Sequence, residues 1–360
     1  MERPPVTDST PTMLLDTLRN ATNRPDLEFV APPTSMSGGY YAEMLRFRLV
    51  DPPAAWDRDL VARIVPNPGA GVREATVQRA VAEQGFATPI VRLTADETGP
   101  LGRYLIVMDA LDGSAPIAGL DLGSLATKVP AILRHLPDRL AFIASALHRL
   151  DPRPLALQLA ELGGTMPTTV AEFVGELGSS AEALGRHDLG RVAKALIDTQ
   201  PAPTTLVISH GDLHPLNLIV AVDDLYLIDW AVALVAPPGF TVGFTHLVLS
   251  SPPVVLPRPL GAMTRWAGRH LADRFLSTYR RLTDGTAGAV DDENLDWHRK
   301  VHALRILVEA ASWDAHGEWP DVDHPWTLLG PAARRLLGIS QASEGTCRPN
   351  SARTTSPPAT

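Results

Sequence analysis

Residues 208–230 read ISHGDLHPLNLIVAVDDLYLIDW, and three polar side chains in this stretch stand out by their chemistry and spacing. Asn217 follows Asp212 after five residues, and Asp229 follows Asn217 after twelve. The residues between Asn217 and Asp229 are mostly apolar and are interrupted by an Asp-Asp turn, which predicts a hairpin of two short strands. Such a hairpin would bring Asn217 and Asp229 to the same end, next to the loop that holds Asp212.

An acid, an amide and a second acid in this order are typical of phosphoryl-transfer sites. In those sites an Asp in a loop accepts the proton of the attacking hydroxyl, and an Asn and an Asp hold magnesium ions. Oxygen donors of this kind suit Mg²⁺, which also binds phosphate oxygens and water. We therefore predict Asp212 as the catalytic residue and Asn217 and Asp229 as ligands of Mg²⁺.

The string His210-Gly211-Asp212-Leu213-His214-Pro215-Leu216-Asn217, followed by Leu227-Ile228-Asp229-Trp230, resembles the aminoglycoside phosphotransferase family. That family is a small-molecule branch of the protein-kinase-like superfamily. Protein kinases have Arg where Gly211 stands, and Asp-Phe-Gly where this chain has Asp229-Trp230-Ala231. The likeness therefore favours the small-molecule branch. His210 and His214 are candidates for support of the catalytic loop, and His214 could instead touch a phosphate or the substrate.

This resemblance implies an α+β, bilobal protein-kinase-like fold. A small antiparallel-sheet N-lobe with one helix would be followed by a larger, mainly helical C-lobe, with the nucleotide in the cleft between them. The implied activity is a phosphotransferase that moves the γ-phosphoryl group of Mg-ATP, or of GTP, to a hydroxyl of an antibiotic-like molecule or a metabolite. The implied cofactor is Mg²⁺, and the acceptor is a small molecule.

Residues upstream of the motif resemble the nucleotide-binding parts of the family. Ser37, Gly38 and Gly39 precede a strand and resemble the loop that covers the phosphates, because glycine lets backbone N–H groups approach a phosphate closely. Arg63 stands where kinases usually have Lys, and a guanidinium can bind phosphate oxygens through two N–H groups. Its expected partner is Glu74 on the next predicted helix.

Glu83 is the second choice as partner of Arg63. Residues 104–113 resemble the hinge between the lobes. By that likeness Met108 would lie behind the adenine, and the Asp109 carbonyl and the Leu111 N–H would bond to its edge. The local pattern alone is equally consistent with a strand that ends in an Asp-Gly turn.

Hydrophobic periodicity divides the chain into a strand-rich part and a later helical part. The strands that we predict are Met44–Val50, Leu60–Val65, Pro89–Leu93, Arg103–Met108, Leu206–Ser209, Leu216–Val222 and Leu225–Ile228. The helices that we predict are Val72–Gln84, Ala131–Leu150 with a fresh start at Pro137, Val170–Leu184, Ala262–Leu282, Leu295–Ala315 and Pro331–Leu337. The expected divisions are a flexible N-terminus (1–24), a nucleotide-binding N-lobe and hinge (25–113), a helical C-lobe with the catalytic loop and acceptor site (114–340) and a disordered tail (341–360).

One departure from the family pattern supports a second hypothesis. Family members commonly have a further Asp, after the metal-binding one, that braces the catalytic loop. Here no Asp occurs between Ala231 and Ala272. Together with Arg63, this gap motivates the alternative that the chain is a nucleotide-binding pseudokinase acting as a regulatory or scaffold module.

Two other groups have both a functional and a structural interpretation. His298 and His302 lie four residues apart and could bind a metal, but no third ligand is apparent, so we favour packing. The acidic residues Asp291, Asp292, Glu293 and Asp296 would suit a polycationic substrate. The N-terminus of a helix explains the same charges without a ligand, and we favour that interpretation.

Composition limits the remaining classes of function. The 360 residues include 32 Lys+Arg and 40 Asp+Glu, a net charge of −8 that argues against a nucleic-acid partner bound through phosphate contacts. The single cysteine, Cys347, rules out an intramolecular disulfide and a multi-Cys zinc site. The sequence shows neither a signal peptide nor an apolar run of about 18 residues. We therefore expect a cytoplasmic monomer or homodimer without a membrane partner.

Overall fold

The computed structural model describes residues 9–36, 42–117, 125–163, 167–202, 205–221, 224–253, 261–317 and 324–339. The predicted phosphate-covering residues Ser37, Gly38 and Gly39 and the predicted tail at 341–360 lie outside these ranges.

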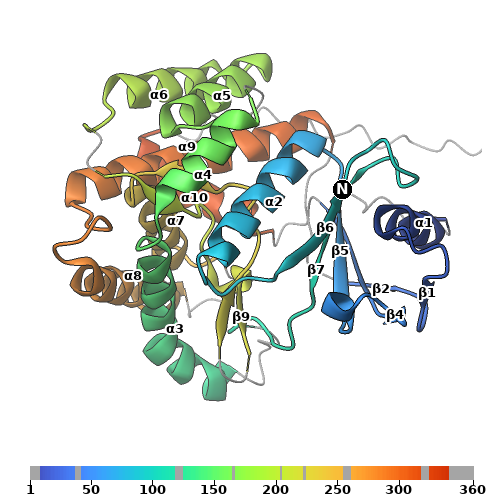
Figure 1. The fold of residues 1–360 in the computed structure, drawn as a ribbon. Coiled ribbons are helices and arrows are strands. Elements are labelled where there is room, and N and C mark those ends of the chain that lie inside the picture. Colours follow the sequence, from blue (N-terminus) through green and yellow to red (C-terminus); the bar gives the residue numbers. More distant parts are fainter. Residues whose placement is uncertain are drawn as a thin grey trace, which may run out of the picture.

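A five-stranded antiparallel sheet forms the centre of the first lobe (Figure 1), in the order β2-β3-β5-β7-β6. Its strands are β2 (Thr34–Ser35), β3 (Glu43–Phe47), β5 (Leu60–Val65), β6 (Val91–Ala95) and β7 (Tyr104–Asp109). Two shorter strands, β1 (Glu28–Phe29) and β4 (Leu49–Val50), pair beside the sheet, and a 3₁₀ turn spans Ala54–Trp56.

Two helices cover the two faces of this sheet, α1 (Thr10–Thr22) on one and α2 (Pro68–Glu83) on the other. Because side chains alternate along a strand, β5 turns Leu60, Ala62 and Ile64 into the core with α1. Val61 and Val65 join the core with α2 on the opposite face. Arg63 shares the face of Val61 and Val65, so the alternation itself directs the guanidinium toward α2.

The N-terminal part differs from the prediction that residues 1–24 are flexible. Residues 10–22 form α1, in which Leu14 and Leu18 are fully buried against the sheet. These two leucines lie four residues apart on one face of a helix that is otherwise largely polar. Such a short apolar stripe gives a weak periodic signal. The prediction of a flexible N-terminus followed the polar, proline-containing composition and did not detect the helix.

The second lobe is mainly helical (Figure 1). Its helices are α3 (Leu125–Leu147), α4 (Pro152–Glu161), α5 (Val170–Ala183), α6 (His187–Asp198), α7 (Gly239–Ser250), α8 (Gly261–Thr283), α9 (Asp292–Ala315) and α10 (Pro325–Leu337). Two antiparallel strand pairs lie among them, β8 (Val207–Ser209) with β11 (Leu234–Ala236) and β9 (Leu218–Val220) with β10 (Leu225–Leu227). No described helix is both long and apolar enough to span a membrane.

Several helix boundaries differ from the predictions. Pro137 lies inside α3 rather than at a fresh helix start, and Pro331 lies inside α10, which begins at Pro325. Helix α7 was not predicted, because ten of its twelve residues are buried and it has no polar face to produce a period. The helices α4 and α6 were also missed.

Two glycines in α7 allow α9 to cross it at close range. A Cβ atom on Gly239 would lie 2.4 Å from His298 Nδ1, and one on Gly243 would lie 2.9 Å from the Arg299 backbone nitrogen. His298 and His302 are buried at this crossing, and the His302 Nε2–H group donates to the Phe240 carbonyl (2.7 Å). Within the described residues, no cluster of His, Cys, Asp or Glu suits a metal ion. Both histidines are buried and bonded to backbone carbonyls, which is consistent with a packing role.

The buried histidines predict a stability that declines in weak acid. Burial lowers the pKa of His148 and His302 to about 3 and that of His246 and His298 to about 4. An unfolded chain protonates each histidine near pH 6.5, so the unfolded state binds more protons between pH 6.5 and pH 4. Each buried histidine should cost up to about 3 kcal/mol of unfolding free energy across that window.

We expect the free energy of unfolding in urea to be constant above about pH 7 and to fall toward pH 4, because the histidines outweigh the opposite contribution of Glu74, whose pKa burial raises to about 7. His302→Gln keeps a side-chain N–H donor but cannot titrate, so its pH slope should be smaller by about one proton. The matched control is His316→Gln, because His316 is exposed. Equal slopes for wild type and His302→Gln would contradict the account.

Candidate active site

The loop that carries Asp212 leaves β8 through a sharp turn at Gly211. Gly211 has a φ angle of +71°, a left-handed conformation that favours glycine. A Cβ atom there would lie 2.4 Å from Cε1 of Phe240. Both the backbone conformation and the space therefore require glycine at this position. The loop continues through a 3₁₀ turn at Pro215–Asn217 directly into β9.

The side chain of Asp212 is held by groups on both of its carboxylate oxygens. Arg305 Nη1, from α9, donates to Oδ1 at 3.0 Å. Asn217 Nδ2 donates to Oδ2 at 3.1 Å and to the Asp212 backbone carbonyl at 2.9 Å. His214 Nε2 lies 3.4 Å from Oδ2. The carboxylate is thus fixed in one orientation by three neighbours.

The ionisation of Asp212 reflects this surrounding charge. Burial by itself would raise the pKa of Asp212, but Arg305, His214 and His210 outweigh burial and hold the pKa well below its usual range. The carboxylate is therefore an anion near neutral pH.

His210 links the Asp212 loop to the strand that precedes Asp229. Its Nδ1 accepts the backbone N–H of Asp212 (3.2 Å), so the proton must lie on Nε2, which donates to the Ile228 carbonyl (3.1 Å). Burial lowers the pKa of His210 to about 4, so the ring is neutral and keeps both bonds near neutral pH. His210 thus bonds to both the Asp212 loop and the strand before Asp229, and its role as loop support stays a prediction.

The hairpin that was predicted after Asn217 is present as β9 and β10. Leu218 pairs with Leu227, and the Ile228 N–H donates to the Asn217 carbonyl at 3.0 Å. Asn217 and Asp229 therefore lie at the same end of the hairpin, beside Asp212. Asp229 adopts a left-handed backbone with φ +66°.

Arg63 connects the sheet lobe to Asp229. Its Nε lies 2.9 Å from Glu74 Oε1 and its Nη2 lies 3.4 Å from Asp229 Oδ1. Burial raises the pKa of Glu74 to about 7, with Arg63 opposing this rise and Asp229 adding to it. Glu74, the first-choice partner, is the residue that pairs with Arg63, whereas Glu83 is exposed at the end of α2.

A second arginine of α2 fixes this helix against the other lobe. Arg73 is buried, and its guanidinium donates to the Ala233 carbonyl (2.7 Å) and to the Pro167 carbonyl. Ala233 follows Asp229 by four residues. Arg73 thus ties the helix that carries Glu74 to the segment that carries Asp229.

The predicted hinge leads from β7 to the hairpin of the catalytic lobe. Met108 is buried, and the Asp109 carboxylate pairs with Arg92 through contacts of 2.7 and 2.6 Å. Beyond the half-buried Leu111, the Ser114 N–H donates to the Val220 carbonyl at 3.2 Å. This placement suits a connection between two lobes, and the roles of Met108, Asp109 and Leu111 toward adenine stay predictions.

Asn217 and Asp229 fit a magnesium ion by the chemistry of their donors. The amide nitrogen of Asn217 faces Asp212, so the amide oxygen Oδ1 is directed away from it. The Asp229 side chain is 37% exposed, which leaves its carboxylate accessible. Mg²⁺ in nucleotide sites typically takes one or two such side-chain oxygens and completes its shell with phosphates and water.

Sequence reasoning missed several residues around Asp212. Arg305 lies on a predicted helix that carries several other charged residues. Its spacing from Glu309, four residues later, is typical of an exposed ion pair on a helix, so nothing in the sequence set it apart. Thr241 and Thr245 lie in α7, which was not predicted. Their hydroxyls bond to the loop backbone, at His210 N (2.9 Å) and at the Leu213 carbonyl (2.8 Å). None of these gives a local sequence signal.

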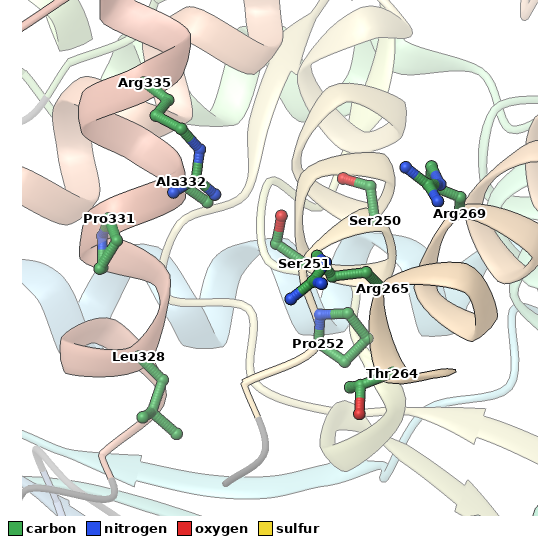
Figure 2. Close-up of a pocket in the computed structure, with 10 residues that line it drawn as sticks. All are labelled: Ser250, Ser251, Pro252, Thr264, Arg265, Arg269, Leu328, Pro331, Ala332 and Arg335. Carbon is green, nitrogen blue, oxygen red and sulfur yellow. The ribbon is translucent and has the colours of Figure 1, made fainter. Parts of the chain in front are cut away.

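A separate pocket of about 340 Å³ lies between the end of α7, α8 and α10 (Figure 2). Arg265 and Arg269 from α8 and Arg335 from α10 line it, beside Ser250 at the end of α7. Among the described residues that line it, none belongs to the Asp212 loop or the hairpin. Cationic side chains are favoured at a helix C-terminus, and these arginines lie near the end of α7.

Comparison with known proteins identifies similar folds. Residues 42–288 match the family model described as "Phosphotransferase enzyme family". An ethanolamine kinase from Plasmodium vivax has a TM-score of 0.57 at 13% identity, covering 89% of this chain and 86% of its own. A macrolide 2′-phosphotransferase type I has a TM-score of 0.55 at 18% identity, covering 93% and 99%.

A thermostable mutant of the aminoglycoside phosphotransferase APH(4)-Ia, in a ternary complex with ADP and hygromycin B, has a TM-score of 0.55 at 15% identity, covering 91% of this chain and 98% of its own. These likenesses confirm the predicted α+β, protein-kinase-like fold. No curated protein matches the chain in sequence.

Replacing Gly211 by alanine should destabilise the catalytic loop. Gly185 provides a matched control, because it has a similar φ angle of +69° but no atom within 4 Å of the position that a Cβ atom would take. Both substitutions impose a left-handed alanine, which costs about 1 kcal/mol, but only Gly211→Ala also meets Phe240. In urea unfolding we expect Gly211→Ala to lose at least about 1–3 kcal/mol more than Gly185→Ala. Equal losses would show that the loop has room to adjust.

Proposed function

The chain belongs to the phosphotransferase enzyme family, and we propose that it moves the γ-phosphoryl group of Mg-ATP or Mg-GTP to a hydroxyl of a small molecule. The observation that carries this proposal is the pair of hydrogen bonds that Asn217 Nδ2 donates, one to the backbone carbonyl of Asp212 and one to its carboxylate. These bonds support the proposal because they hold the Asp212 carboxylate in place and leave the Asn217 amide oxygen free of Asp212, as a metal ligand would need. The nucleotide would bind between the lobe of residues 25–113 and the lobe of residues 114–340.

In this proposal Asp212 orients the acceptor hydroxyl and accepts its proton. Because the pKa of Asp212 lies well below its usual range, the carboxylate is a weak base, and orientation is its main contribution. Phosphoryl transfer passes through a loose transition state that requires little deprotonation of the nucleophile before the new bond forms. Correct placement of the hydroxyl therefore matters more than basicity.

Asn217 and Asp229 would hold Mg²⁺, which neutralises charge on the phosphate oxygens when it is bound. Arg63 stays charged at all working pH values and would bind phosphate oxygens from the sheet lobe, with Glu74 fixing its direction. Ser37, Gly38 and Gly39 would cover the phosphates. Met108, Asp109 and Leu111 would contact the base.

The acidic residues at the start of α9 do not support a polycationic acceptor. The Asp291 carboxylate caps the helix by accepting the Asn294 N–H (2.7 Å). Asp292 pairs with Arg280 (2.6 Å), and Asp296 pairs with Lys300 (2.7 Å). These residues therefore do not narrow the class of acceptor beyond a molecule with a hydroxyl group. A panel of antibiotics and hydroxylated metabolites, tested with ATP and with GTP, is the way to search for it.

Asp212→Asn should suppress turnover and leave nucleotide binding intact. We expect kcat to fall by about 10²–10⁴-fold, because the acceptor loses its orienting anion, with the Kd for Mg-ADP unchanged within about twofold. The matched control is Asp224→Asn, in the exposed turn of the same hairpin. Wild-type turnover by Asp212→Asn would refute the assignment. Binding of Mg-ADP by the wild-type protein without turnover on any compound would favour the pseudokinase hypothesis.

Asp229→Asn should weaken the binding of nucleotide only when magnesium is present. The loss of one anionic ligand is expected to raise the Kd for Mg-ADP by at least about tenfold, while the Kd for ADP in EDTA stays near the wild-type value. Calorimetry with and without EDTA measures both constants. The same Kd for Mg-ADP in both proteins would remove Asp229 from the metal site.

A further inference from the structure

We infer that Arg305 is the positioning residue for Asp212 and takes the place of the bracing Asp that is absent between Ala231 and Ala272. This inference rests on the proposed role of Asp212. Arg305 lies 93 residues after Asp212, on α9, and bonds to the carboxylate oxygen that Asn217 does not contact. Its Nη1 donates to Asp212 Oδ1 (3.0 Å) and to the Gly211 carbonyl (3.3 Å). One nitrogen therefore holds both the side chain and the backbone of the loop.

Arg305 is itself fixed in position. Its Nε donates to Glu309 Oε1 at 2.8 Å, and Glu309 Oε2 accepts the indole N–H of Trp326. The guanidinium carbon lies 5.5 Å from the ring centre of Phe244 and 5.4 Å from that of Trp326. The residue is 6% exposed. Aromatic rings and a second carboxylate thus prevent the guanidinium from leaving Asp212 for solvent.

Hydroxyl groups of α7 complete the support that a bracing carboxylate would give. Thr241 Oγ1 accepts the His210 N–H (2.9 Å), just before Asp212, and Thr245 Oγ1 donates to the Leu213 carbonyl (2.8 Å), just after it. These neutral bonds satisfy the loop backbone on both sides. They do not contact the Asp212 carboxylate, so its orientation depends on Arg305 together with Asn217 and His214.

The geometry requires a guanidinium rather than any cation. Arg305 serves two carboxylates, Asp212 and Glu309, through different nitrogens of one planar group. A lysine keeps the charge but has a single nitrogen, so it cannot hold both partners in the same geometry. Arg305→Lys should therefore leave the charge balance intact while loosening the orientation of Asp212.

The test measures hydrolysis of Mg-ATP, with water as acceptor, and hydrogen exchange of the loop at residues 210–217. For Arg305→Lys we expect kcat to fall about 10–100-fold, KM for Mg-ATP to stay within about twofold, and exchange in the loop to accelerate. In an Asp212→Asn background the same substitution should cause no further loss of kcat, because Arg305 acts through Asp212. The matched control is Arg299→Lys, which pairs with Asp296 on the same helix and should leave both readouts unchanged.

Unchanged kcat and loop exchange in Arg305→Lys, with Asp212→Asn inactive, would overturn the inference and leave the proposed function standing. Full activity of Asp212→Asn would instead overturn the proposed function. If Arg305→Lys does not fold, Glu309→Gln decides, because it removes the charge that fixes Arg305 and keeps the shape. The inference is supported if Glu309→Gln lowers kcat in the wild-type background but not in the Asp212→Asn background. If Glu309→Gln leaves kcat unchanged, Arg305 serves the fold alone.

Discussion

A buried ion pair between Asp212 and Arg305 is the constraint on which the arrangement of the catalytic lobe depends. Side-chain exposures of 15% and 7% mean that both charges have given up most of their water, and each would be strongly destabilising without the other. Keeping the pair together requires α9 to lie against the loop after β8. The small residues Gly239 and Gly243 of α7 permit that approach.

The contact between the sheet lobe and the β9–β10 hairpin also depends on buried charges. Glu74 and Arg63 are buried together, and Arg63 also reaches Asp229, so the sheet lobe presents its cation at the end of the β9–β10 hairpin. Arg73 also holds the lobes together, through hydrogen bonds to the backbone carbonyls of Pro167 and Ala233. Helix α2 therefore carries Glu74, which pairs with Arg63 next to Asp229, and Arg73, which bonds to the other lobe.

The parts of the site that sequence could predict are those whose partners lie close in the chain or on a regular element. Asn217 and Asp229 flank one hairpin, and the alternation of β5 directs Arg63 toward Glu74. Arg305 could not be predicted, because its partner lies 93 residues away and helical periodicity treats a charged residue as a surface position. Helix α7 was not predicted for a different reason. It is buried on nearly all sides, so its hydrophobic residues show no helical period.

A structure of the protein with Mg²⁺ and ADP tests the central claim most directly. The account predicts a metal ion at about 2.0–2.1 Å from Asn217 Oδ1 and from a carboxylate oxygen of Asp229. It also predicts that Asn217 Nδ2 and Arg305 remain bonded to Asp212 in that complex. A metal ion bound without Asn217 and Asp229, or an Asp212 carboxylate released from Arg305 when nucleotide binds, would contradict the account.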